Sequence, residues 1–130
     1  IVKVKLPYNL GQAGAIAGEL ALDNAALVER RVRQLVARRA QWRALLEESQ
    51  DEVFDSEANF LLARNEKQKG LLVKNSLAER GIRVRDVSAG PGLEGCLRFS
   101  VGSGAALRAT AQTMNGLASF TGSFSLQEPR

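Results

Sequence analysis

The stretch from residue 81 to residue 102 limits the possible folds most, because it predicts two short β-strands joined by a glycine-rich loop. Over residues 82–85 isoleucine and valine alternate with two arginines, and over residues 97–101 three apolar residues alternate with an arginine and a serine. Successive side chains of a strand point to opposite faces of the sheet. We therefore expect the apolar residues to point into a core and the arginines to point away from it.

Arg85 and Arg98 can stand on the same face of this sheet if the two strands are neighbours. Two guanidinium groups held close together repel each other unless an anion lies between them. Planar, permanently charged guanidinium groups suit a carboxylate or a phosphate that is bound through two hydrogen bonds. The pattern alone also fits a pair of solvated surface arginines, which is the commoner situation for charged residues.

The remaining segments predict four helices and two further strands. The helices are expected over residues 10–22, 25–48, 66–80 and 104–117, and the strands over residues 53–54 and 59–63. Together with the two arginine strands they give the order α-α-β-β-α-β-β-α. This order predicts an α/β fold of the α+β type, in which a small, mostly antiparallel sheet carries helices on one face.

Helical periodicity also predicts which residues are buried. In the second helix the expected buried stripe is Val28, Val32, Leu35, Trp42 and Leu46. In the third helix the residues expected to point inward are Leu71, Leu72, Leu77 and Ala78. Gly81 is expected to close that helix at its C-terminal end. The first helix is rich in alanine and glycine, so we expect it to pack closely against a larger body.

The sequence indicates one domain with a short segment on either side. Residues 1–9 predict a linking strand and turn, residues 10–117 the domain, and residues 118–130 a mobile tail. The chain starts with Ile1, in what reads as the middle of a strand. We therefore expect it to be a piece of a longer protein.

Composition excludes several classes of function. The chain has no histidine, which rules out histidine-based catalysis and most zinc sites. Cys96 is the single cysteine, so no internal disulfide can form, and the chain fits a reducing, cytoplasmic compartment. No apolar run approaches the roughly 20 residues of a membrane-spanning helix. The net charge of +4 is spread around a helix and aromatic residues are few, so we expect no membrane and no nucleic-acid partner.

Four short motifs resemble those of histidinol-phosphate aminotransferase, a branch of the fold-type-I pyridoxal-phosphate aminotransferases. They are K-x-P-Y-N at residues 5–9, S-x-A-N-F at residues 56–60, V-R-D at residues 84–86, and G-C-L-R-x-x-V-G at residues 95–102. The motifs follow one another in the family's order and at compatible spacing. The similarity covers about residues 3–117.

The resemblance implies the C-terminal small domain of a homodimeric enzyme that uses pyridoxal 5′-phosphate and acts on a small molecule. In this family the lysine that binds the cofactor lies upstream, in a serine-x-x-lysine context within a large domain. The lysines of this chain, none of which has that context, are Lys3, Lys5, Lys67, Lys69 and Lys74. The chain is therefore expected to need a cofactor-binding partner domain and to be inactive alone, with no catalytic, cofactor-binding or metal-binding residue of its own.

The implied full-length reaction belongs to histidine biosynthesis and converts L-histidinol phosphate and 2-oxoglutarate to imidazole acetol phosphate and L-glutamate. By resemblance, Arg98 binds the anionic group of the substrate and Arg85 lies near the same anion. Asn59 is expected among the substrate-binding residues, near the mouth of the active site. Tyr8 and Asn9 are expected to approach the active site of the neighbouring subunit.

One departure from the family pattern concerns the last helix. Residues 102–104, Gly-Ser-Gly, replace the common Gly-Thr-Pro, which predicts a weakened start of that helix. Two alternatives share the strand arginines and the fold: an aromatic-amino-acid aminotransferase and a threonine-phosphate decarboxylase. A third alternative, of a different class, is a basic binding module without catalysis.

Overall fold

The computed structural model describes residues 11–121 of the chain, apart from the side chains of residues 67, 68 and 118–121. The described residues form two compact units, which divide between Gln34 and Leu35. The single domain predicted over residues 10–117 stays a prediction. The predicted linking segment, which includes Tyr8 and Asn9, lies outside the described residues.

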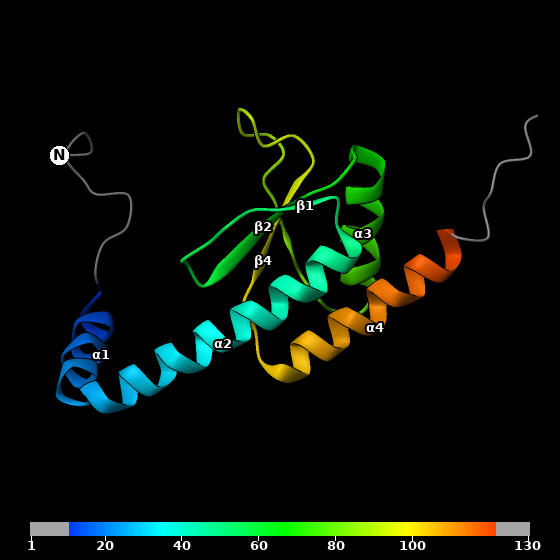
Figure 1. Cartoon of the computed structure of the whole chain (residues 1–130). Coiled ribbons are helices and arrows are strands. Elements are labelled where there is room, and N and C mark those ends of the chain that lie inside the picture. Colours follow the sequence, from blue (N-terminus) through cyan, green and yellow to red (C-terminus); the bar gives the residue numbers. More distant parts are fainter. Residues whose placement is uncertain (1–10, 122–130) are drawn as a thin grey trace, which may run out of the picture. The chain divides into compact units, whose positions relative to one another are not determined.

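Eight elements follow one another in the predicted order (Figure 1). They are α1 (Gln12–Asp23), α2 (Ala25–Ser49), β1 (Glu52–Val53), β2 (Phe60–Arg64), α3 (Lys67–Glu79), β3 (Arg85–Asp86), β4 (Cys96–Ser100) and α4 (Gly104–Thr121). The four strands form one sheet in the order β1-β2-β4-β3, and every neighbouring pair is antiparallel. The predicted small antiparallel sheet is therefore confirmed.

One face of the sheet forms the core of the unit from residue 35 onward. The odd-numbered residues of β2 and β4 point into this core and are at most 2% exposed: Leu61, Ala63, Leu97 and Phe99. Side chains from three helices cover them, namely Trp42 and Leu46 of α2, Val73 and Leu77 of α3, and Met114 of α4. Figure 1 shows these helices beside the sheet, so the prediction of helices on one face is confirmed.

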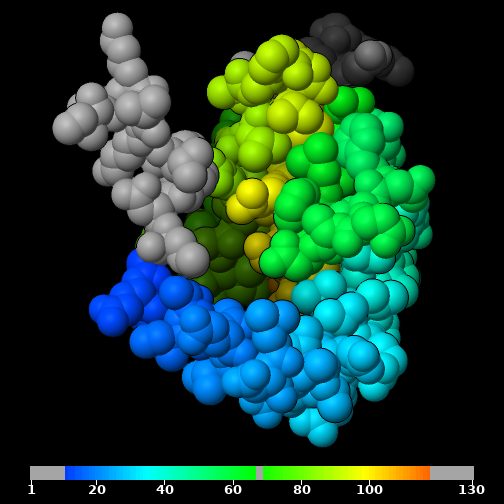
Figure 2. Space-filling model, turned by 90° about the vertical axis from the view of Figure 1, so that its left-hand side faces the viewer, coloured from blue at the N-terminus to red at the C-terminus, as the bar shows by residue number. Residues whose placement is uncertain are grey.

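The even-numbered residues of β2 and β4 point to the opposite side, where Cys96 at the start of β4 is buried and the others are accessible. We call this side the open face and define it by six residues: Phe60, Leu62, Arg64, Arg85, Arg98 and Ser100. All six are exposed or only partly buried. In Figure 2 the yellow atoms around β4 reach the surface between green and yellow-green segments. Apart from Cys96, the alternation read from the sequence therefore separates a buried face from an accessible one.

The buried stripe predicted for α2 holds only in its second half. Trp42 and Leu46 are buried, but Val28 and Val32 are 40% and 54% exposed. Val28 and Val32 belong to the first unit, whose described part contains helix and no sheet. No residue of α1 is buried either. The close packing predicted for α1 stays a prediction.

Of the residues predicted to point inward from helix α3, only Leu77 is buried. Val73 and Leu77 are buried, whereas Leu71 and Leu72 are about half exposed and Ala78 is also exposed. Val73 and Leu77 are four positions apart, so they lie one above the other on the helix face that meets the sheet. The prediction of Leu71, Leu72 and Ala78 as inward-pointing residues was wrong.

Gly81 closes α3 as predicted. Its φ angle of 76° is in the left-handed region, which glycine adopts readily. The N–H of Gly81 donates to the carbonyl of Ala78, and the N–H of Ile82 donates to the carbonyl of Leu77. These two bonds form a Schellman motif. Because Ile82 donates to the helix, the predicted strand starts later, and β3 contains only Arg85–Asp86.

Helix α4 differs from its prediction at both ends. The hydroxyl oxygen of Ser103 accepts a hydrogen bond from the N–H of Ala106 at 3.2 Å, which caps the helix and corrects the expected weakness. At the other end α4 continues to Thr121, four residues past the predicted boundary. Residues 122–130 of the predicted tail lie outside the described residues.

Among the helices described over residues 11–121, none combines the length and the apolar character that crossing a membrane requires.

The glycine-rich loop before β4 provides a test of this fold. Gly95 has a φ of 72°, and a methyl group on it would overlap the carbonyl oxygen of Asn65. Gly92 has a nearly equal φ of 73°, but a methyl group there would meet no atom within 4 Å. We expect Gly95→Ala to lower the free energy of unfolding by about 3 kcal/mol or more, and Gly92→Ala by about 1 kcal/mol. Urea denaturation of both variants measures the difference, and equal losses would contradict the close contact.

Candidate functional site

Arg85 and Arg98 are directly opposite each other in the β3–β4 ladder. Residues that pair directly across two antiparallel strands place their side chains on the same face, a few ångströms apart at Cβ. The two arginines therefore share the open face, as the sequence alternation predicts. Their role in binding an anion stays a prediction.

Arg98 lies at the centre of the open face. On its other side, across the β2–β4 ladder, it pairs with Leu62. Its guanidinium carbon is 5.1 Å from the centroid of the Phe60 ring. The Nε atom of Arg98 is buried and has no hydrogen-bond partner among the described residues. Arg98 is thus a partly buried cation on a strand that is paired on both sides.

The charge of Arg98 is also unpaired in the described part of the chain. Each other partly buried arginine or lysine there pairs with a carboxylate: Arg39 with Glu57, Arg43 with Glu47 and Asp55, Arg64 with Glu52, Lys69 with Asp51, and Lys74 with Asp86. Withdrawing a charge from water is unfavourable unless an opposite charge compensates it. The open face is therefore suited to an anion that the described residues do not supply.

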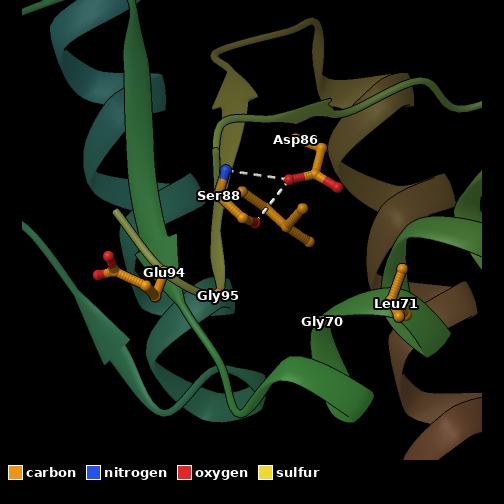
Figure 3. A pocket seen from close by; sticks show the side chains of 7 residues that line it. Gly70, Leu71, Asp86, Ser88, Glu94 and Gly95 are labelled. Atoms are coloured by element: carbon orange, nitrogen blue, oxygen red, sulfur yellow. Dashed lines mark hydrogen bonds between the residues drawn. The ribbon is translucent and has the colours of Figure 1, made fainter. Parts of the chain in front are cut away.

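Arg85 is exposed, and the residue that follows it fixes the short strand β3. Asp86 accepts hydrogen bonds from the backbone N–H and the hydroxyl of Ser88, at 3.0 and 2.6 Å (Figure 3). Its other carboxylate oxygen lies 3.0 Å from the Lys74 ammonium of α3. The Ser88 hydroxyl, followed by Lys74 and the Ser88 N–H, lowers the pKa of Asp86 from 3.8 to about 2. Asp86 thus connects the strand of Arg85 to α3.

A cavity of about 230 Å³ adjoins Asp86 and is lined by Gly70, Leu71, Asp86, Ser88, Glu94, Gly95 and Leu97 (Figure 3). Asp86 and Leu97 are paired residues that follow Arg85 and precede Arg98, so alternation directs them away from the open face. The carboxylate of Asp86 is already hydrogen-bonded. In Figure 3 the carboxylate of Glu94 points away from Asp86. This cavity is therefore separate from the arginine site.

A second cavity, of about 470 Å³, lies on the open face. Its lining residues are Phe54, Asp55, Ser56, Glu57, Ala58, Phe60, Leu62, Arg64, Gly92 and Leu93. Phe60 and Leu62 of this lining are also the β2 neighbours of Arg98. Arg98 is consequently bordered by a hollow whose lining includes Phe60 and Leu62. These residues were not predicted as part of the site, although Phe60, Leu62 and Arg64 recur at every second position and could have indicated a shared face.

Asn59 is not brought to this site. It precedes β2, is exposed, and its carbonyl accepts a hydrogen bond from the N–H of Val101 at 2.9 Å. Val101 packs against the core, so the alternation places these two residues on the side away from Arg98. The substrate-binding role of Asn59 stays a prediction.

Both lysines whose side chains are described lie in ion pairs. Lys69 and Lys74 are each held by a carboxylate, Asp51 and Asp86 respectively, and lie away from the arginine pair. What the described residues present on the open face is the unpaired charge of Arg98.

Comparison with known proteins finds similar sequences and similar structures, although no family model matches the sequence. Histidinol-phosphate aminotransferase 2 of Nitrosococcus oceani is 34% identical over 103 residues, which are 78% of this chain and 29% of that protein. Histidinol-phosphate aminotransferase of Escherichia coli strain SMS-3-5 is 37% identical over 107 residues, 79% of this chain and 30% of that protein. The chain therefore spans about three tenths of the length of these curated relatives.

Two solved structures share the fold. Histidinol-phosphate aminotransferase from Clostridium acetobutylicum matches with a TM-score of 0.73 and 20% identity, over 91% of this chain and 36% of that one. A putative aminotransferase from Burkholderia pseudomallei matches with a TM-score of 0.69 and 29% identity, over 92% of this chain and 35% of that one. The fold is that of the C-terminal small domain of fold-type-I aminotransferases.

The relatives at 34% and 37% identity are histidinol-phosphate aminotransferases, and this confirms the resemblance carried by the four motifs.

The lowered pKa of Asp86 makes a prediction about acid stability. Because its pKa is about 2 in the folded chain and near 3.8 when unfolded, ionised Asp86 stabilises the fold above pH 3.8. That contribution is lost as the pH falls from 3.8 through 2. We expect Asp86→Asn to be less stable than the unchanged chain at pH 7, and the difference to shrink between pH 4 and pH 2.

Urea denaturation at a series of pH values measures this effect. Ser88→Ala removes the largest cause of the pKa shift and should reproduce part of the change. A difference between Asp86→Asn and the unchanged chain that stays constant from pH 7 to pH 2 would show that Asp86 does not contribute through its charge.

Proposed function

We propose that this chain is the substrate-anion-binding domain of a pyridoxal-phosphate-dependent aminotransferase, and specifically of histidinol-phosphate aminotransferase. The observation that carries the proposal is the partly buried, unpaired charge of Arg98, directly opposite Arg85 on the open face. The sequence similarity to histidinol-phosphate aminotransferases supports the choice of enzyme.

The substrates proposed for this site carry the anions that two arginines can hold. L-histidinol phosphate has a phosphate group, and 2-oxoglutarate has carboxylates. A guanidinium group presents N–H donors in a planar fork that matches either group. Arg98 holds the anion from the central strand, and Arg85 adds a second positive charge from the edge strand. Holding the anion at this place orients the rest of the substrate relative to the reacting centre.

The cofactor chemistry is proposed to come from outside the described residues. When bound, pyridoxal phosphate supplies an electron sink for the bond changes at the substrate's amino-bearing carbon. Neither Lys69 nor Lys74 fits the covalent attachment of this cofactor, because each is held by a carboxylate. The chain is therefore proposed to work with a cofactor-binding large domain, in a homodimer in the cytoplasm, and to be inactive without that domain.

A chimeric enzyme tests the proposal. The 107 matching residues of the Escherichia coli enzyme are replaced by the corresponding residues of this chain, and amino transfer from L-histidinol phosphate to 2-oxoglutarate is measured. We expect activity in the chimera and a loss of about 100-fold or more in kcat/KM for Arg98→Met, because truncating one partner of a desolvated charge pair costs several kcal/mol. Arg83→Met, at an exposed arginine two residues before Arg85, is the matched control and should change kcat/KM less than about twofold.

Three outcomes decide the matter. Equal activity of the Arg98→Met and unchanged chimeras would refute anion binding by Arg98. A well-folded chimera that turns over aromatic amino acids in preference to L-histidinol phosphate, or decarboxylates threonine phosphate, would replace the proposed substrate with that of a related enzyme. A third outcome is a well-folded chimera that has none of these activities, together with a 130-residue chain that does not bind inorganic phosphate. This outcome would favour the basic binding module without catalysis.

A further inference from the structure

We infer that Phe60 is a positioning residue for Arg98: its ring holds the guanidinium group by attraction to the aromatic face and leaves the N–H donors free for an anion. This inference rests on the proposed function, because it assigns the anion to Arg98. Phe60 is the first residue of β2 and is partly buried on the open face.

The sheet register determines this contact. Phe60 pairs directly with Ser100, and Arg98 is two residues earlier on β4, so Phe60 and Arg98 are diagonal neighbours on one face. Long and aromatic side chains reach each other at this separation. The guanidinium carbon of Arg98 lies over the Phe60 ring, 5.1 Å from its centroid, which is within the range of a cation–π interaction.

A second arginine on the same face shows what distinguishes Arg98. The guanidinium carbon of Arg64 lies over the ring of Phe54 at 4.9 Å. Arg64 also donates to the carboxylate of Glu52 at 2.8 Å and to the carbonyl of Gly92 at 3.0 Å. Its donors are therefore engaged, and its role is structural. Arg98 has the ring contact, but no carboxylate or carbonyl of the described residues accepts a hydrogen bond from it.

The difference between a ring and a carboxylate is chemical. A carboxylate accepts the N–H donors of arginine and would compete with a substrate anion for them. An aromatic ring attracts the charge through its quadrupole and takes up none of the strong donors. An arginine that is already held near its binding position also loses less side-chain freedom when the anion arrives. Phe60 thus raises anion affinity without touching the anion.

Nuclear magnetic resonance of the 130-residue chain tests the inference, with arginine side chains labelled by ¹⁵N. The chain is titrated with inorganic phosphate while the Arg98 Nε–Hε signal is followed. We expect Phe60→Leu to weaken phosphate binding about three- to thirty-fold. The same variant should remove the ring-current shift of the Arg98 signal, and Phe60→Tyr, which keeps the ring, should restore both. Phe54→Leu is the matched control, because it removes the other ring contact and should leave phosphate affinity unchanged.

The results separate this inference from the proposed function. The proposed function itself is contradicted if the unchanged chain does not bind phosphate, or if the Arg98→Met variant binds phosphate as tightly as the unchanged chain. Binding that depends on Arg98 but is unchanged in Phe60→Leu contradicts the role of Phe60 alone. If Phe60→Leu does not fold, the unchanged chain still decides: a nuclear Overhauser effect between Arg98 Hε and the Phe60 ring protons supports the contact, and its absence overturns it.

Discussion

The antiparallel pairing of β3 with β4 is the interaction on which the site depends. It involves only two pairs of residues, yet it places Arg85 opposite Arg98. The β2–β4 ladder of five pairs supports it from the other side and sets Leu62 and Phe60 beside Arg98. Backbone hydrogen bonds thus bring together side chains from three segments that are distant in the sequence. The shared face follows from strand geometry, without any direct bond between the two arginines.

The helices make this arrangement rigid by filling the other face. Phe99 alternates with Arg98 along β4, so any shift of the strand that moved Arg98 would also displace a fully buried ring from the core. Close packing makes such a shift costly. Asp86 has a similar effect at the edge of the sheet, where its bonds to Ser88 and Lys74 hold β3 to its loop and to α3. Core packing and surface hydrogen bonds therefore act on the same two strands.

The sequence was sufficient for the features that depend on local periodicity. Alternation at every second residue predicted that Arg85 and Arg98 share a face, and the helical pattern with Gly81 predicted α3 and its end. The contact between Phe60 and Arg98 depends on the register of two strands, which no local pattern specifies. The exposure of Val28 depends on which residues a helix meets in three dimensions, so periodicity alone predicted it wrongly.

The unequal surroundings of the two arginines have a consequence for the range of anions that one site can accept. Arg98 sits on a strand bonded on both sides, whereas Arg85 sits on a two-residue strand at the border of the sheet. Borders of sheets open at a lower free energy than their centres. The guanidinium group of Arg98 is therefore held in place, whereas that of Arg85 can move. In the anion site proposed above, such a pair would close on a tetrahedral phosphate and on a smaller, flat carboxylate without a change of fold.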